Sequence, residues 1–226
     1  MLLTLDPLYY ILVGPALLLS IFASMKVKRT FKKFSKVATA SGMTGAQAAQ
    51  RMLATSGVHD VQIEAVSGFL SDHYDPSKKV LRLSPDVFSG KSVASVGVAA
   101  HEAGHALQDA GGYAPLKLRT AIVPVASIGS SLAWPLLIFG FILSSLALIK
   151  VGIIFFGAAV AFQIITLPVE FNASRRAVAA LSSSGMLMEQ EVDGARTVLR
   201  AAAMTYVAAA ATAILQLLYF LLLSRR

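Results

Sequence analysis

The chain has 226 residues, of which 56% are hydrophobic and only 14% are charged. Because a soluble domain carries about 25% charged residues, this composition predicts a membrane protein. The absence of cysteine excludes disulfides and any zinc site built on thiolates. The net charge of +8 would suit a nucleic-acid partner, but the basic residues gather beside an apolar run, so no nucleic-acid binding is expected.

The first apolar run, residues 7–25, predicts a transmembrane helix with Tyr9 and Tyr10 as anchors at the membrane interface. An acidic residue precedes it and basic residues follow it, which is the reverse of a secretory signal peptide and favours a retained anchor. The basic residues are Lys26, Lys28, Arg29, Lys32, Lys33 and Lys36. They predict contact with anionic lipid headgroups and a cytoplasmic location for this end of the span.

A small region with helix and strand signals comes next. Residues 41–58 predict a short helix, because Thr44 and Gln47 form a capping box. Alternating apolar residues predict a strand over residues 61–65, and residues 80–83 predict a returning strand. Together they are expected to form a small antiparallel hairpin or sheet.

Residues 92–109 predict a helix that carries the most informative motif of the chain, H-E-A-G-H at 101–105. His101 and His105 are four residues apart, so their imidazoles lie on one helix face, one turn from each other. This spacing allows both to bind a single Zn²⁺, with Glu102 acting on a zinc-bound water.

Three further uncharged runs predict transmembrane helices over residues 121–148, 151–169 and 201–223. Since Lys150 is the one charged residue between the first two, they are expected to form a tight hairpin that returns the chain to the membrane face it left. The chain is therefore expected to have four transmembrane helices in total, with both termini outside. Arg225 and Arg226 would then lie outside, against the usual charge bias.

A catalytic zinc site needs a third protein ligand and an open position for water. The hairpin returns the chain to the interface at Glu170, which is therefore expected beside the two imidazoles. Ser174, one helical turn later, could support the site by hydrogen bonding, with Asn172 and Arg175 as further candidates. The alternative is an interfacial salt bridge between Glu170 and Arg175 or Arg176.

The sequence resembles the YugP-type membrane zinc metallopeptidases over most of the chain from Gly42 to about Ala209. The resemblance lies in S-D-H-Y-D-P at 71–76, S-V-G-V-A-A-H-E-A-G-H-A at 95–106 and T-L-P-V-E-F-N-A-S at 166–174. A more distant similarity connects it to HtpX-type and CAAX prenyl proteases. Those enzymes place a Glu ligand after a membrane hairpin in a Glu-Phe-x-Ala-Asp context, whereas Ser174 stands here at the Asp position.

The expected function is a membrane-bound, zinc-dependent endopeptidase of the gluzincin kind. One Zn²⁺ held by His101, His105 and Glu170 would activate a water, and Glu102 would pass the water's proton to the leaving amine.

The oxyanion of that reaction needs a second donor, for which His73 and Tyr74 are candidates. The alternative is structural, with His73 capping the turn through Asp75. One strand of the hairpin could also pair with an extended substrate.

The whole chain, residues 1–226, is interpreted as one metallopeptidase unit of a mainly α, multi-pass cell-membrane protein with a small α+β, zincin-like region. The parts at 26–120 and 170–200, and with them the active site, are expected in the cytosol, so the substrates would be peptides or membrane-associated proteins. Small residues in the spans could mediate a homo-oligomer, but packing within the chain explains them equally well.

Two rival functions remain at this point. A metal transporter would need an ion path, yet the motif helix lies outside the apolar runs and no second histidine-rich span exists. A catalytically silent, zinc-binding scaffold would not need Glu102, because a structural site uses no general base.

Overall fold

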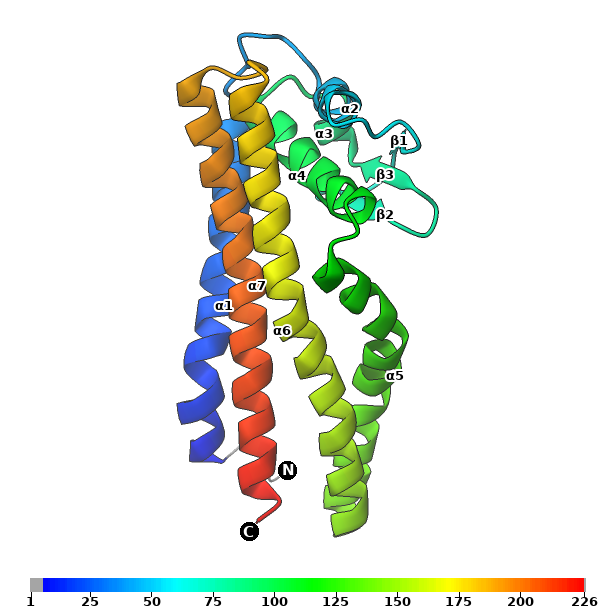
Figure 1. The fold of residues 1–226 in the computed structure, drawn as a ribbon. Coiled ribbons are helices and arrows are strands. Elements are labelled where there is room, and N and C mark those ends of the chain that lie inside the picture. The colour runs from blue at the N-terminus through cyan, green and yellow to red at the C-terminus, as the bar shows by residue number, and fades with distance from the viewer. Residues whose placement is uncertain (1–5, 226) are drawn as a thin grey trace. The chain divides into compact units, whose positions relative to one another are not determined.

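The structure is a computed structural model, and it describes residues 6–225. The elements in chain order are α1 (Pro7–Phe34), α2 (Gly45–Thr55), β1 (Gln62–Ala65), β2 (His73–Asp75), β3 (Val80–Leu83), α3 (Pro85–Phe88), α4 (Val93–Ala110), α5 (Ala114–Ile142), α6 (Leu146–Ser183) and α7 (Glu189–Leu223) (Figure 1).

The described residues form two compact units, whereas the sequence was interpreted above as a single metallopeptidase unit. The apolar unit contains the residues up to Ser24, Lys117–Pro168 and the residues from Met204 onward. The site unit contains Met25–Leu116 and Val169–Ala203. The long helices α1, α6 and α7 each contribute residues to both units.

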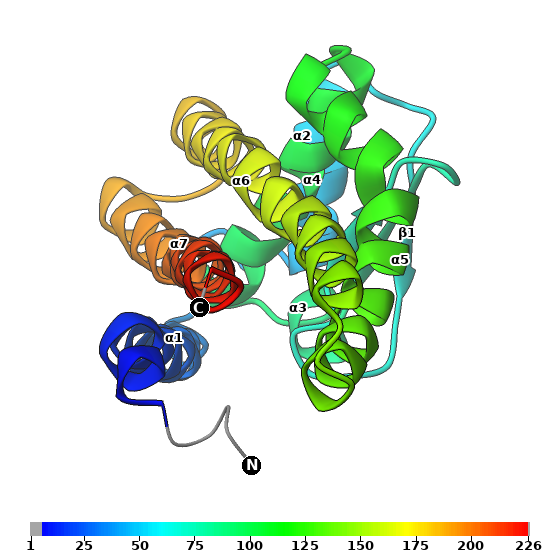
Figure 2. The same ribbon diagram turned by 90° about the horizontal axis from the view of Figure 1, so that it is seen from below.

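Among the described residues, four helices are long and apolar enough to cross a membrane, namely α1, α5, α6 and α7. This confirms the predicted mainly α class with about four transmembrane helices. In the apolar unit, α1 and α7 lie side by side (Figure 2), with the rings of Tyr9 and Tyr219 in edge contact at 5.1 Å. Ser20 Oγ and Thr212 Oγ1 are 3.1 Å apart in the same contact.

The hairpin between α5 and α6 turns earlier than predicted. The expected turn at Lys150 is wrong, because α5 ends at Ile142 and the turn occupies residues 143–145. Ser144 adopts a φ of +52°, and the N–H of Ser145 donates to the carbonyl oxygen of Gly140 at 2.8 Å. Lys150 instead lies exposed near the start of α6.

The helix predicted at 41–58 is α2, and its start follows the predicted capping box. The N–H of Gln47 donates to Thr44 Oγ1 at 3.2 Å, and the N–H of Thr44 donates to Gln47 Oε1 at 2.9 Å. α2 packs across α4 through a shared core that includes Met52 and Leu81. This packing anchors the motif helix on one side.

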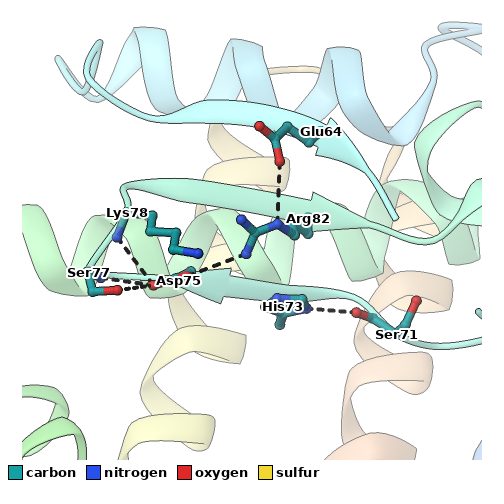
Figure 3. A network of polar contacts seen from close by, with 7 residues as sticks. All are labelled: Glu64, Ser71, His73, Asp75, Ser77, Lys78 and Arg82. Carbon is teal, nitrogen blue, oxygen red and sulfur yellow. Dashed lines mark hydrogen bonds and ion pairs between the residues drawn. The ribbon is translucent and has the colours of Figure 1, made fainter. Parts of the chain in front are cut away.

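The small sheet has the strand order β1-β3-β2 and is mixed. β3 pairs antiparallel with β2 but parallel with β1, so the expected antiparallel pairing of 61–65 with 80–83 is wrong. The hairpin partner of β3 is the three-residue strand β2, which is too short to show an alternating apolar pattern. The central Arg82 reaches Glu64 on β1 and Asp75 on β2, each at 3.4 Å (Figure 3).

Asp75 also organises the turn after β2. Its Oδ1 accepts hydrogen bonds from the hydroxyl of Ser77 at 2.6 Å and from the N–H groups of Ser77 and Lys78 (Figure 3). The Ser77 hydroxyl, the two backbone donors and Arg82 together lower the pKa of Asp75 below its usual range. The turn is therefore capped by Asp75 itself.

The motif helix α4 is capped by Ser92, whose Oγ accepts from the N–H of Ser95 at 3.1 Å. Two glycines let it approach the neighbouring helices closely. A Cβ on Gly104 would lie 2.6 Å from the carbonyl oxygen of Ala173 in α6, and one on Gly97 would lie 3.2 Å from Cβ of Ala195 in α7. The face of α4 that carries Gly104 is thereby held against α6.

Candidate metal centre

Both motif imidazoles face the same carboxylate. Nε2 of His101 lies 3.2 Å from Glu170 Oε2, and Nε2 of His105 lies 3.5 Å from that same oxygen. One ligand atom from each of the three residues fits within a mutual separation of 4.8 Å. The structure thus brings together the three residues that the sequence analysis selected as ligands, across 69 positions of sequence.

The donor set and its spacing suit a tetrahedral zinc ion. Ligand atoms at about 2.0–2.1 Å from a tetrahedral Zn²⁺ lie about 3.3 Å from one another, which is close to the 3.2 and 3.5 Å from the two Nε2 atoms to Glu170 Oε2. Glu170 is only 2% exposed and His105 only 6%. A carboxylate buried to this extent requires a cationic partner, and a metal ion between it and two imidazoles satisfies that need.

A buried glutamine orients His105. Gln108, with 0% exposure, places its side-chain Oε1 at 3.0 Å from His105 Nδ1. Its Nε2 donates to the carbonyl oxygen of Val169 at 2.8 Å and to Asn172 Oδ1 at 3.0 Å. Gln108 therefore links α4 to the segment of α6 that carries Glu170.

The direction of these hydrogen bonds is set by Arg176. Its Nε can only donate, and it lies 2.8 Å from Asn172 Oδ1, so that atom is an acceptor. Gln108 must then present its NH₂ group to Asn172 and its Oε1 to His105. It follows that His105 carries its proton on Nδ1 and leaves the lone pair of Nε2 free to face Glu170.

Ser174 orients the imidazole of His101, as Gln108 orients that of His105. Its Oγ lies 3.1 Å from His101 Nδ1, so the hydroxyl oxygen can accept a hydrogen bond from the Nδ1–H group. The lone pair of Nε2 is then directed at Glu170. Ser174 thus supplies a neutral hydrogen-bond acceptor to His101.

The other predicted supporting residues fall in different places. Asn172 belongs to the network through Gln108 and Arg176, while Arg175 is exposed. The guanidinium of Arg176 also lies over the ring of Tyr113 at 6.0 Å. The carboxylate of Glu170 faces the two imidazoles, whereas Arg176 engages Asn172, an arrangement that favours the ligand interpretation over the interfacial salt bridge.

Glu102 lies in the same turns of α4 as the two histidines and is 8% exposed. Gln108 was not among the residues selected from the sequence, although it stands three positions after His105 on the motif helix. That i,i+3 spacing was the available signal.

Tyr74 and His73 lie on β2. The hydroxyl of Tyr74 donates to Asp109 Oδ2 at 2.9 Å, and Asp109 also pairs with Lys79 at 3.3 Å. Burial and the bond to Asp109 raise the pKa of Tyr74 above its usual value, so the phenol keeps its proton. His73 is exposed, with its Nδ1 2.8 Å from the carbonyl oxygen of Ser71 (Figure 3).

Four membrane-length helices, together with two histidines of an H-E-x-x-H helix that meet a buried glutamate of α6, point to the membrane zinc metallopeptidases as a class. The family model described as "Putative neutral zinc metallopeptidase" matches residues 9–225, and the chain belongs to that family. It is 49% identical over 216 residues to the "Putative membrane protease YugP" of Bacillus subtilis (strain 168), covering 96% of each chain. No solved structure matches the chain.

Proposed function

We propose that this protein is a membrane-bound, zinc-dependent endopeptidase that uses one zinc ion held by His101, His105 and Glu170. The observation that carries the proposal is the convergence of both Nε2 atoms on Glu170 Oε2, while both Nδ1 atoms are hydrogen-bonded elsewhere. When bound, zinc supplies a Lewis acid that polarises the scissile carbonyl and brings the pKa of a water to about 7.

Glu102 acts as the general base and then as the general acid. It takes a proton from the attacking water and delivers it to the leaving amine. Its position between the two histidines on α4 and its burial support this role. The same carboxylate argues against a catalytically silent scaffold, since a structural zinc site has no use for a base.

The substrate backbone is held by the outer edge of β2. Within residues 6–225, β2 has a strand on one side only, and Tyr74 connects it to Asp109, one helical turn after His105. An extended peptide added as a strand at this edge would run beside the motif helix. Both candidates for the second oxyanion donor already donate a hydrogen bond elsewhere, Tyr74 to Asp109 and Nδ1 of His73 to the carbonyl oxygen of Ser71. Of the two, only His73 has a second ring nitrogen, Nε2, which donates when the imidazole is protonated.

The site faces the cytosol, with both termini outside the cell membrane, and its substrates are peptides or membrane-associated proteins. The basic residues that follow the first apolar run support this orientation. Reporter fusions after residue 40 and at the C-terminus test it. A cytoplasmic signal from the C-terminal fusion would contradict the four-span arrangement with external termini.

Zinc content and cleavage should be measured on the same preparations of the full-length protein in detergent. Wild-type protein should contain one zinc and cleave casein. Glu102→Gln should keep the zinc but lose cleavage by at least about 100-fold, the lower end of what general-base catalysis contributes. Glu189→Gln, the same chemical change at an exposed site, should behave as wild type.

Equal cleavage by wild type and Glu102→Gln would overturn the mechanism. The transporter alternative predicts a different result, namely uptake of zinc into liposomes that contain the protein. Zinc uptake without peptide cleavage would replace the proposal by that alternative.

A further inference from the structure

The site unit contains a cavity of about 670 Å³ that is lined by four lysines, Lys28, Lys32, Lys36 and Lys91. We call it the lysine pocket. A single carboxylate, that of Asp86, lines it as well. None of its lining residues belongs to the metal group or to the hydrogen bonds that support it.

Backbone pairing assembles the pocket from two distant segments. Lys28 and Lys32 stand one turn apart on α1, and Lys36 lies in the turn that follows it. The carbonyl oxygen of Lys91 accepts from the N–H of Thr39 at 3.0 Å, which fixes the loop before α4 beside the end of α1. The clustering of lysines is therefore a property of the fold rather than of the α1 sequence alone.

The positive charge of the pocket is not neutralised within the described chain. None of the four lysines forms an ion pair with another residue among 6–225, and Asp86 is the one acidic group in the lining. Like charges that share a cavity repel one another, and an anion bound between them relieves that repulsion. Lysine ammonium groups are a common means of binding phosphate.

Aromatic rings border the same cavity. Phe31 of α1 and Phe69 of the loop between β1 and β2 meet edge to face at 5.8 Å. Phe69 remains 59% exposed. An exposed phenylalanine beside lysines is typical of surfaces that lie at the headgroup region of a bilayer, whereas Phe31 is buried beneath it. On α1, Lys28 follows the uncharged run by only three positions, so the pocket begins where the apolar part of that helix ends.

We infer that the lysine pocket binds the phosphate headgroup of an anionic glycerophospholipid. The net charge of the lining favours a lipid with net negative charge over a zwitterionic one, whose own ammonium group would meet four others. This site goes beyond the proposed peptidase activity and depends neither on zinc nor on cleavage.

Native mass spectrometry of the full-length protein in detergent tests the site, with phosphatidylglycerol and phosphatidylcholine as probes. The variant Lys32→Gln/Lys91→Gln removes two charges from the pocket. The control Lys33→Gln/Lys78→Gln removes two exposed charges outside it. Because each lysine contributes roughly a five-fold gain in binding anionic lipid, the pocket variant should bind phosphatidylglycerol about 30-fold more weakly than wild type.

The control variant should bind phosphatidylglycerol within about three-fold of wild type, and phosphatidylcholine should bind weakly to all three proteins. Equal losses in the two variants would overturn the proposal, because they would reflect net charge alone. Binding of inorganic phosphate or a glutamate-rich peptide without binding of phosphatidylglycerol would overturn it too. Unchanged thermal unfolding of both variants without added lipid shows that the fold is intact.

Discussion

The side-chain Oε1 of Gln108 lies 3.0 Å from Nδ1 of His105, which joins the second imidazole of the motif to a fully buried amide. The same amide donates to the carbonyl oxygen of Val169, next to Glu170. One side chain thus orients a histidine ligand and holds the backbone beside the carboxylate ligand. Metal affinity should therefore depend on Gln108, although it does not itself approach the metal position.

Replacing Gln108 by leucine should weaken zinc binding by about 10- to 100-fold, since partners that orient a ligand commonly contribute that much. Competition with a chelator measures the affinity directly, without any assay of cleavage. Gln50→Leu, at an exposed position of α2, is the matched control and should bind zinc as wild type does. Unchanged affinity in Gln108→Leu would show that His105 needs no partner at Nδ1.

The hydroxyl of Ser174 should contribute less than Gln108, because it is only partly buried and a water can replace it. Ser174→Ala is expected to lower zinc affinity by up to about ten-fold. Ser174→Asp, which restores the carboxylate found in the related proteases, should bind zinc at least as tightly as wild type, since an anionic acceptor makes His101 a stronger donor of electrons. An affinity of Ser174→Asp below that of Ser174→Ala would contradict this reasoning.

Gly104 should tolerate no side chain. In Gly104→Ala the new Cβ would meet the carbonyl oxygen of Ala173, so α4 and α6 must separate, at a cost of about 1–3 kcal/mol in the free energy of unfolding. Gly157→Ala, where no atom lies within 4 Å of the added Cβ, should be neutral or slightly stabilising, because alanine favours helix. Thermal unfolding of the two variants side by side gives the comparison.

Tyr74 should give stability a dependence on alkaline pH. Its pKa in the folded protein is raised above the ordinary value of 10.0, first by burial and then by its bond to Asp109. The stabilisation is therefore complete below pH 10 and is lost as the pH rises further, since the unfolded chain releases the phenolic proton first. Tyr74→Phe should cost about 1 kcal/mol at pH 8.

Unfolding by denaturant at several pH values measures this effect. The difference in stability between wild type and Tyr74→Phe should shrink between pH 10 and pH 11.5. A difference that stays constant over that interval would mean that the phenol titrates normally in the folded protein.

The sequence alone predicts those elements whose signals lie within a few neighbouring residues. The capping box of α2, the helix over residues 92–109 and the placement of His101 and His105 on one helix face follow from spacing within a single helix. Glu170 could be placed as well, because a membrane hairpin must return to the face it left. The turn of that hairpin could not be placed from the sequence, since an uncharged run shows which residues are compatible with lipid and not where a helix ends.

The missed features depend on contacts between segments. β2 is three residues long, and its pairing with β3 becomes apparent only once both lie against α4. Gln108 is an unremarkable helix residue until Val169 and Asn172 are brought to it by the return of α6. Lys91 likewise joins the lysines of α1 only through the backbone pairing of the two loops.

The guanidinium of Arg176 affects how the group of His101, His105 and Glu170 would bind a metal ion. Because this group can only donate hydrogen bonds, it fixes the orientation of the Asn172 amide and, through it, that of the Gln108 amide. In the opposite orientation, the NH₂ group of Gln108 would face Nδ1 of His105. The imidazole is thus committed to one tautomer before any ion arrives. Binding of an ion at Nε2 of His105 would then need no change of tautomer, which removes one step from the assembly of the site.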